Sequence, residues 1–378
     1  MTQKFDVCIR GGGIVGRVLA LLLAQQQLKV VLRVWPPSGT AAAQGHSDIR
    51  AYALNAASRE VLESVRAWPE REGEQLEPVT PVDRMEVQGD QGGMLCFRAA
   101  DVGAEALNWI VDVPALEQRL VQALRFQSRV VVWDQAEDPP ACPLTVVCEG
   151  RRSATRAEWG MSYDVKSYPH HALAARLRLP QAHSGVAKQW FKDGEIAALL
   201  PLGGAQGCDV ALVWSAPHLK VTELLALNAP DFVLALTQIT GLAPEDICLT
   251  HSPQSWPLEL SQAQHWVLPG LALAGDAAHA MHPLAGQGLN AGLGDVAELA
   301  RVLQAREYWR SLGDVKLLRR YERARKAEFA AMGGLTDGLF TLFKHPHPWV
   351  QQLRNQGFDV VNRWTPIKTW LTRQAMGR

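Results

Sequence analysis

Residues 271–295, LALAGDAAHAMHPLAGQGLNAGLGD, carry the pattern that decides the fold. An apolar run over residues 266–274 leads into this stretch and predicts a buried strand. Three glycines follow at positions 286, 288 and 292, where a helical spacing of apolar residues begins. Glycines at the start of a helix leave backbone N–H groups bare, and the helix dipole favours negative charge there. The stretch therefore predicts a site for a phosphate or an electron-rich ring.

A matching glycine turn lies near the N-terminus. A predicted strand at residues 5–9 precedes Gly11-Gly12-Gly13-Ile14-Val15-Gly16, and a helix at 18–24 and a strand at 29–34 follow it. This order is the first unit of a dinucleotide-binding fold, with Gly11, Gly13 and Gly16 at the positions of the G-x-G-x-x-G motif. The motif alone is weakly specific, but its place between a strand and a helix favours dinucleotide binding over a purely structural turn. One ligand that contacts both glycine turns explains why the chain has two.

The first unit lacks one expected side chain. The motif predicts an acidic residue about 20 positions further on, which accepts hydrogen bonds from the ribose hydroxyls. No Asp or Glu occurs between Gly16 and Asp48, and the second predicted strand ends at Val34-Trp35. Either the ribose is held in another way or the nucleotide is held weakly.

Arg50 has two interpretations. It lies two residues after Asp48, so the two side chains can form an ordinary surface ion pair, which contributes little to stability. The alternative is an arginine held near a diphosphate or the edge of an isoalloxazine ring. The spacing does not choose between them.

Composition argues against several classes of function. The chain of 378 residues has 38 Lys and Arg and 38 Asp and Glu, and this zero net charge argues against nucleic acid as the main partner. The six cysteines include no CxxC pair, which favours reduced, buried thiols in a cytoplasmic protein. No apolar run reaches the ~18 residues of a membrane span, and the N-terminus lacks the pattern of a signal peptide.

A metal site is the tempting interpretation of two histidines in the central stretch. His279 and His282 are three positions apart, which on a helix would place both on one face. Pro283 breaks such a helical pair, and no third ligand stands nearby in the sequence. We therefore predict no metal site.

The rest of the chain predicts a second lobe and a helical end. Residues 84–97 alternate like a hairpin, and residues 170–214 continue the alternation over several short runs. Together they predict a separate, mostly antiparallel sheet with one covered face, the sheet lobe. Residues 315–342 predict a long helix, and residues 349–376 form an apolar and basic tail. Such a tail can lie on a membrane surface, but packing against the sheet lobe is the favoured alternative.

Several motifs together resemble a known family. They are the two glycine turns, the segment Asp48-Ile-Arg50-x-x-Ala53-Leu54, and the short runs Trp109-Ile-Val111 and Leu199-Leu-Pro-Leu202. Over nearly its whole length the chain resembles the flavin-dependent aromatic hydroxylases of ubiquinone biosynthesis, within the larger class similar to 4-hydroxybenzoate hydroxylase. The central stretch, from Gly275-Asp276 to Asp295, is the most specific part of the match.

The resemblance implies an α/β fold with three parts: a Rossmann-like FAD-binding domain, an inserted antiparallel-sheet substrate lobe and a C-terminal helical region. The FAD-binding domain would be discontinuous and comprise residues 1–80, 100–160 and 265–330. The substrate lobe would comprise residues 81–99 and 161–264, and the helical region residues 331–378.

The resemblance also implies a bound FAD and assigns residues to it. The pyrophosphate would be held by the N-terminal turn, through Gly11, Gly13, Ile14, Val15 and Gly16. Asp276 would contact the ribityl chain or the pyrophosphate, Arg50 would lie along the same cofactor, and Glu149 would stand where the family carries Asp. The backbone facing the electron-poor edge of the flavin would be that of Gly286, Gly288, Leu289 and Asn290. The catalytic candidates beside the ring are Pro283, His282 and Gln287.

The implied chemistry is ring hydroxylation. NAD(P)H or another reductant reduces the flavin, O2 forms a flavin hydroperoxide, and OH is transferred to a polyprenylated phenol or quinol precursor. Such a site must exclude water and aim hydrogen-bond donors at the developing charge. The resemblance further implies other ubiquinone-biosynthesis proteins as partners, and a cytoplasmic location with contact to the inner membrane face through the C-terminal region.

Three departures from the family keep other functions open. Val34 or one of its neighbours stands where the family has an acid, Glu149 adds a methylene where the family has Asp, and the segment 129–148 is short for the family's hairpin. All three surround the cofactor, so the main alternative is a non-catalytic relative with weakened FAD binding that holds a quinone precursor or scaffolds a complex. A flavin reductase or oxidase of the same fold is a third interpretation.

Overall fold

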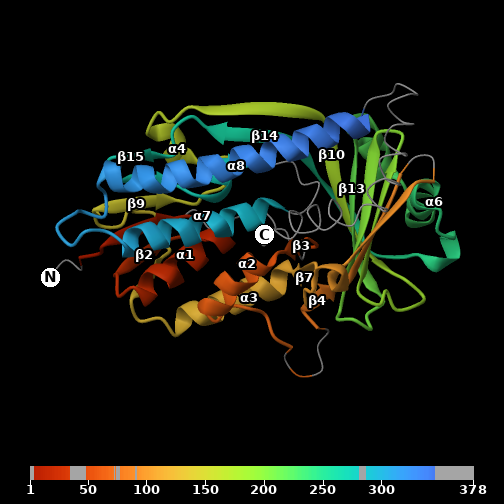
Figure 1. Ribbon diagram of the computed structural model, residues 1–378, viewed down its shortest axis with the longest axis horizontal. Helices are drawn as coiled ribbons and strands as arrows, with labels where there is room; N and C mark the ends of the chain where they lie inside the picture. The colour runs from red at the N-terminus through yellow and green to blue at the C-terminus, as the bar shows by residue number, and fades with distance from the viewer. Residues whose placement is uncertain are drawn as a thin grey trace.

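The computed structural model describes residues 4–34, 48–71, 73, 77–89, 92–280 and 287–344, and for residue 287 and residues 331–344 it describes the backbone alone. Figure 1 shows an elongated molecule, with a parallel sheet and its helices at one end and a tall antiparallel sheet at the other. Helix α8 (Val315–Lys344) runs along the first part toward the second. This arrangement confirms the predicted α/β fold with a Rossmann-like part and a sheet lobe. The domain bounds given above stay a prediction.

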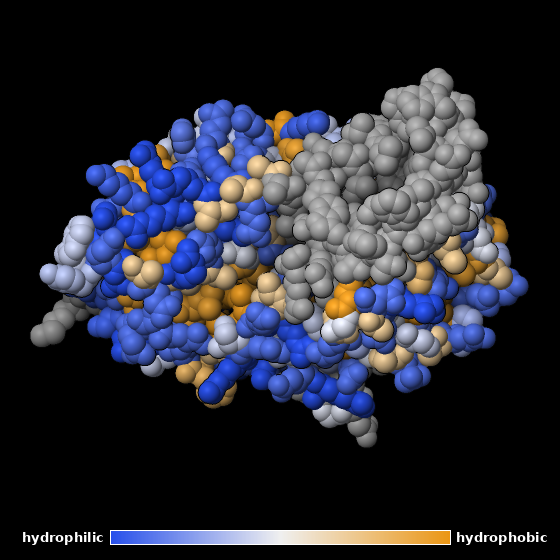
Figure 2. Space-filling model, viewed as in Figure 1, coloured by the Kyte–Doolittle hydropathy of each residue, from blue (hydrophilic) through white to orange (hydrophobic). Residues whose placement is uncertain are grey.

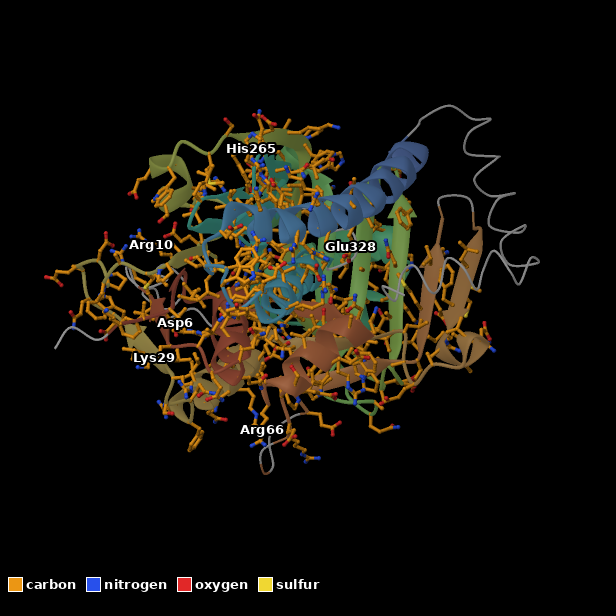
Figure 3. All side chains as sticks on the ribbon, turned by 60° about the vertical axis from the view of Figure 1, so that its left-hand side comes forward. Asp6, Arg10, Lys29, Arg66, His265 and Glu328 are labelled. Carbon is orange, nitrogen blue, oxygen red and sulfur yellow. The ribbon has the colours of Figure 1, made fainter. Side chains whose placement is uncertain are left out.

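Six short strands form the sheet of the first part, in the order β15-β16-β9-β1-β2-β8. Every neighbouring pair from β16 to β8 is parallel. Val7, Val30 and Val31 are fully buried, as expected of parallel strands that are covered on both faces. The bounds are β1 (Val7–Arg10), β2 (Val30–Arg33), β8 (Val130–Trp133), β9 (Leu144–Val147), β15 (Val267–Leu268) and β16 (Leu271–Leu273). Figure 3 shows Asp6 and Lys29 close together just before β1 and β2, where the Lys29 N–H donates to Asp6 Oδ2 at 2.7 Å.

The single strand expected over residues 266–274 is wrong in one respect, because it is divided in two. Pro269 and Gly270 separate β15 from β16, and Gly270 has a φ of +73°. The left-handed backbone at a glycine turns the chain, so β15 and β16 pair with each other in antiparallel register. β16 then continues the parallel sheet beside β9.

Helices α1 (Ile14–Gln25), α3 (Val113–Arg125) and α7 (Gln287–Gln304) pack in one layer beside this sheet (Figure 1). Leu19 and Leu23 of α1 and Leu293 of α7 are completely buried in one continuous core. Burial of each leucine contributes about 1.5–3 kcal/mol, so apolar packing holds the layer together.

A three-stranded antiparallel sheet joins the two parts of the molecule, in the order β3-β7-β4. The bounds are β3 (Ala51–Leu54), β4 (Val79–Val82) and β7 (Asn108–Asp112), and α2 (Ala56–Ser64) follows β3. Successive side chains of a strand point to opposite faces. Val111 of β7 accordingly packs in the core of the first part, and Ile110 packs with Leu202 in the core between the parts.

Eight strands form the sheet lobe, in the order β17-β14-β10-β13-β12-β11-β5-β6. Every neighbouring pair is antiparallel except β5 with β11, which confirms the mostly antiparallel expectation. Strand β14 pairs with β10 along most of its length. The bounds are β5 (Arg84–Gln88), β6 (Met94–Arg98), β10 (Tyr163–Arg178), β11 (Val186–Lys192), β12 (Glu195–Leu202), β13 (Asp209–Pro217), β14 (Cys248–Ala263) and β17 (His279–Ala280).

Two helices cover one face of the sheet lobe, α5 (His218–Ala226) and α6 (Ala229–Thr240). Phe232 of α6 meets Trp214 of β13 edge to face, with ring centroids 6.2 Å apart. Both side chains are almost completely buried, and such aromatic pairs dominate the packing energy of a small core.

Hydrophilic residues cover most of the described surface on the face in Figure 2, and apolar residues lie in smaller groups between them. Among the described residues, we find no helix with the length and apolar character needed to cross a bilayer.

Candidate functional site

The N-terminal turn requires its glycines. Gly11 has a φ of +119°, and a Cβ there would lie 2.3 Å from the carbonyl oxygen of Cys148. A Cβ at Gly16 would lie 2.0 Å from the carbonyl oxygen of Gly11. Both distances are far below van der Waals contact and both involve backbone atoms, so no other residue fits at either position.

The first turn of α1 is open to a ligand. Gly13 is the N-cap residue, it makes no side-chain cap, and the first turn of the helix has no acidic residue. No atom lies within 4 Å of the position that a Cβ of Gly13 would occupy. The first N–H groups of a helix have no partner within the helix, and the dipole there attracts anions. The geometry suits a phosphate group, as the sequence predicts.

The two glycine turns meet through Val15. A Cβ at Gly275 would lie 3.3 Å from both methyl carbons of Val15, and a Cβ at Gly292 would lie 2.9 Å from Val15 Cγ2. Gly275 belongs to the central stretch and Gly292 to α7, whereas Val15 belongs to the N-terminal turn. The expectation that the two turns fold together is therefore confirmed.

A buried ion network holds the central stretch in place. Asp295 of α7 is fully buried; its Oδ2 accepts a hydrogen bond from the Gly275 N–H at 2.8 Å and lies 2.7 Å from His279 Nε2. Arg325 of α8 donates through Nε to the other oxygen, Oδ1, at 2.8 Å. Burial alone would raise the pKa of Asp295, but His279 and Arg325 lower it below its usual value. The carboxylate is therefore charged and ties three elements to one point.

His279 is committed to this network. Its ring stacks on Trp266 with centroids 4.8 Å apart and lies 4.8 Å from the ring of Phe329. Its strand β17 pairs with the edge of β14, so the central stretch also joins the sheet lobe. Within the described parts of the chain, we find no group of three or more His, Cys, Asp or Glu placed to hold a metal ion.

Asp276 lies beside the Gly275 turn with a positive side chain near it. Arg151 Nε is 3.5 Å from Asp276 Oδ2, and the Tyr163 hydroxyl donates to the Asp276 carbonyl oxygen at 2.8 Å. Desolvation raises the pKa of the Asp276 carboxyl group, and Arg151 acts in the opposite direction. The carboxyl group thus has one weak ionic partner and capacity for further hydrogen bonds.

Asn290 anchors the first turn of α7. Its Oδ1 accepts hydrogen bonds from the Asn55 N–H at 3.0 Å and the Ser58 hydroxyl at 2.7 Å. Its Nδ2 donates to the Ala53 carbonyl oxygen at 2.8 Å. The side chain therefore fixes the start of α7 against β3 and α2. Next to it Leu289 is buried, and at Gly288 no atom lies within 4 Å of a Cβ position.

Arg50 forms the ion pair that the sequence allows. Its Nε and Nη2 both donate to the Asp48 carboxylate, and its Nη1 donates to the Tyr52 hydroxyl at 3.2 Å. The pair is only partly exposed, at 43% for Arg50 and 19% for Asp48. The hydrogen bond to Asp48 raises the pKa of Arg50. The structure therefore contains the ion pair between Arg50 and Asp48. This pair is compatible with a second role of Arg50 beside a cofactor.

Glu149 uses its carboxylate locally. It accepts hydrogen bonds from the Ser153 hydroxyl at 2.7 Å, the Thr155 hydroxyl at 2.7 Å and the Thr155 N–H at 3.1 Å. All three donors lie at the start of α4 (Ala154–Glu158). The longer side chain thus reaches around the turn to hold a helix, a role that sequence spacing did not reveal.

Val34 stands at the end of β2 against the N-terminal turn. Its Cγ1 would be 2.6 Å from a Cβ at Gly12, so the position of the missing acid faces the glycines as the motif requires.

The predicted residues His282, Pro283 and Gly286 lie outside the described residues, as does the side chain of Gln287, whose backbone begins α7.

The described residues fit an FAD molecule. The open start of α1 offers N–H groups to a pyrophosphate, and the tight glycines let a ligand approach the backbone. Val15, Gly275 and Gly292 bring the second turn, which includes Asp276, to the same place. One ligand can therefore contact both turns.

The comparisons with known proteins agree with this geometry. A family model described as FAD binding domain matches residues 126–333. The chain is similar to ubiquinone hydroxylase UbiL of Rhodospirillum rubrum, with 30% identity over 98% of this chain and 89% of that protein. It is also similar to 3-demethoxyubiquinol 3-hydroxylase of Escherichia coli, with 27% identity over 99% of each chain. The crystal structure of p-nitrophenol 4-monooxygenase PnpA of Pseudomonas putida has the same fold, with a TM-score of 0.75, 18% identity, and coverage of 100% of this chain and 99% of that one.

Proposed function

Because the chain belongs to the FAD-dependent monooxygenases of ubiquinone biosynthesis, we propose that it hydroxylates the aromatic ring of a polyprenylated phenol or quinol precursor. The protein is an aromatic-ring monooxygenase with FAD as cofactor, and NAD(P)H is the electron donor typical of this class. The names of two relatives, a ubiquinone hydroxylase and a 3-demethoxyubiquinol 3-hydroxylase, support the class of substrate.

The observation that carries the proposal is the contact of Val15 with Gly275 and Gly292. It brings an open helix N-terminus and a second glycine turn to one location, although they are some 260 residues apart along the chain. A dinucleotide needs both features, because its phosphates and its ring system bind at different points.

We assign the pyrophosphate to the turn formed by Gly11, Gly13, Ile14, Val15 and Gly16. Asp276 would contact the ribityl chain or the pyrophosphate, and Arg50 would lie along the cofactor. Glu149 supports the turn at the start of α4, next to Cys148 and Gly11. The backbone N–H groups that would face the electron-poor edge of the flavin are those of Gly286, Gly288, Leu289 and Asn290.

FAD, when bound, supplies the electron transfer and the activation of O2 that ring hydroxylation requires. The protein supplies position and field: N–H donors at the start of α7 stabilise negative charge on the ring system. We place Pro283, His282 and Gln287 beside the ring as the catalytic candidates. This placement rests on the family resemblance.

The non-catalytic alternative is not favoured, because the relatives that match over nearly the whole chain are named as hydroxylases. Partner proteins of ubiquinone biosynthesis and contact with the inner membrane face stay proposals. The tail that would make such a contact, residues 349–376, lies outside the described residues.

The test is a flavin titration followed by product analysis. The purified protein should bind added FAD, oxidise NADH or NADPH only when the phenol is present, and incorporate one atom of ¹⁸O from ¹⁸O2 into the ring. Protein that stays colourless with excess FAD would reject the assignment of the glycine turns. Protein that binds FAD but leaves the substrate free of ¹⁸O is a reductase or an oxidase.

A further inference from the structure

We infer that Arg176, a residue of the sheet lobe, is a positioning residue for Arg50. Arg176 lies near the end of β10, on the opposite side of the domain boundary from the proposed cofactor residue. It contacts the backbone of Ile49 and Arg50. The inference rests on the proposed function, because Arg50 has a cofactor to position only if FAD binds.

The guanidinium of Arg176 holds the chain on both sides of the Ile49–Arg50 peptide bond. Its Nε donates to the Ile49 carbonyl oxygen at 2.7 Å, and its Nη2 donates to the Arg50 carbonyl oxygen at 2.9 Å. Two donors in a rigid, planar group that grip successive carbonyls restrict the rotation of the backbone between them. The backbone at Arg50, directly before β3, is therefore held in one direction.

A carboxylate from a third element locks the guanidinium in place. Asp112 pairs with Arg176 Nη2, and the Arg176 side chain is only 14% exposed. Asp112 is the N-cap residue of α3, yet its side chain makes no cap hydrogen bond. An Asp at this position usually caps the helix. Here the Asp112 carboxylate pairs with Arg176 instead, and helix α3 has no side-chain cap.

The sheet is shaped around this side chain. β10 and β14 pair in register except at three points, and two of these shifts flank Arg176. Irregularities of this kind bend a strand and change the direction of a side chain. Arg176 therefore leaves the pleated face of the sheet lobe and reaches the segment before β3.

The side chain of Arg50 is held independently by Asp48, as described above. Arg176 fixes its backbone, and Asp48 fixes its guanidinium. A residue held at both ends is pre-organised, so a ligand that binds it pays little ordering entropy. Removal of Arg176 should weaken the contribution of Arg50 to FAD binding without removing Arg50 itself.

The test is a double-mutant cycle on FAD affinity, measured by the quenching of flavin fluorescence. The variants are Arg176→Met, Arg50→Met and the double variant. Arg178→Met is the matched control: Arg178 also lies on β10, two residues further on, but it pairs with Asp209 of the neighbouring strand instead of the backbone at Arg50. We expect Arg176→Met to raise the Kd of FAD about tenfold and Arg178→Met to change it less than about twofold. In the Arg50→Met background, Arg176→Met should change the Kd less than about twofold.

Several outcomes would overturn the inference. They are an unchanged Kd in Arg176→Met, an unchanged Kd in Arg50→Met, or equal losses from Arg176→Met with and without Arg50. If circular dichroism shows that Arg176→Met does not fold, Arg176→Lys replaces it. Lysine keeps the charge but can donate to only one of the two carbonyls, so we expect Arg176→Lys to raise the Kd of FAD roughly threefold. In the Arg50→Met background the same substitution should have no effect on the Kd. An Arg176→Lys variant that binds FAD as tightly as the wild type would contradict the inference. A wild-type protein that binds no FAD would instead reject the proposed function.

Discussion

Val15 and Gly292 are in contact across the interface between the two glycine turns. A methyl group at Gly292 would lie 2.9 Å from Val15 Cγ2, closer than two carbon atoms pack. The N-terminal turn and α7 can approach this closely only because one of the two residues has no side chain. The cofactor proposal depends on this approach, and it can be tested from either side.

Gly292→Ala should destabilise the protein although it lies within a helix. Alanine favours a helix over glycine by about 1 kcal/mol, but overpacking in a core costs about 1–3 kcal/mol, and the second effect should win. The double variant Val15→Ala/Gly292→Ala restores the space and should be more stable than Gly292→Ala alone. Urea unfolding of the two variants measures the difference. If Gly292→Ala is as stable as the wild type, the turns are not in tight contact.

Asp295→Asn should be among the most damaging polar substitutions. It removes the fully buried carboxylate that pairs with Arg325 and leaves the guanidinium with the more exposed Glu328. Breaking a buried ion pair typically costs about 3–5 kcal/mol. Glu298→Gln, on the same helix, is the control, because Glu298 pairs with the exposed Arg301 and such a pair is worth at most about 1 kcal/mol. Urea unfolding of both variants gives the two free energies. If both variants lose the same free energy of unfolding, the buried network stabilises the protein no more than a surface ion pair does.

The effect of Asp295→Asn should depend on pH in one direction. The folded-state pKa of Asp295 lies below its usual value, since His279 and Arg325 outweigh the effect of burial. A carboxylate with a lowered pKa stabilises the protein fully above its unfolded pKa of about 4, and this contribution is lost as the pH falls through the folded-state pKa. The stability difference between wild type and variant should therefore be level from about pH 7 to 5 and shrink below about pH 4. A difference that grows toward low pH would contradict the network.

Val34→Glu should strengthen FAD binding. Val34 stands at the end of β2 against Gly12, where a carboxylate would accept hydrogen bonds from the ribose hydroxyls. Hydrogen bonds to a charged group contribute about 1.5–3 kcal/mol, so we expect roughly tenfold tighter binding. Val34→Gln is the control of equal length without the charge. A flavin titration that finds the Glu variant no tighter than the Gln variant would mean that the ribose lies elsewhere.

The cysteines should differ in reactivity according to burial. The thiolate is the reactive form, and burial raises the pKa of Cys8 to about 11, while Cys248 is exposed. With iodoacetamide at about pH 8, Cys248 should be modified in the native protein and Cys8 only after unfolding in urea. Mass spectrometry of tryptic peptides distinguishes the two. Early modification of Cys8 would show that β1 is accessible in the native state.

The sequence predicted those features that local chemistry determines. Gly16 is needed because of a contact within the turn, with the carbonyl oxygen of Gly11. The place of the glycines between a strand and a helix therefore identifies the motif, although the contact of Gly11 with Cys148 could not be predicted. The alternation of residues 170–214 likewise predicts an antiparallel sheet because a strand repeats every two residues. The apolar run at 266–274 misled in one detail, since Pro269-Gly270 divides it and apolar character alone does not show a turn.

The parts that the sequence could not predict depend on partners far along the chain. Arg325 and Asp295 are 30 residues apart, and Arg176 and Arg50 are 126 apart. No periodicity relates such pairs, because each depends on how whole elements pack. The hydrogen bonds of Glu149 could not be predicted for a similar reason. The sequence shows that its side chain is longer than Asp, but its contacts with Ser153 and Thr155 depend on the conformation of the turn between them.

The long strand β10 contacts the backbone of two residues that we assign to the cofactor, one near each of its ends. Tyr163, at its start, donates to the carbonyl oxygen of Asp276, and Arg176, near its end, grips the backbone at Arg50. A chimaera that takes its sheet lobe from a relative must therefore carry a compatible Tyr163 and Arg176 together. An exchange that divides β10 in the middle would join one half to the wrong counterpart and should yield an enzyme that folds but releases its cofactor.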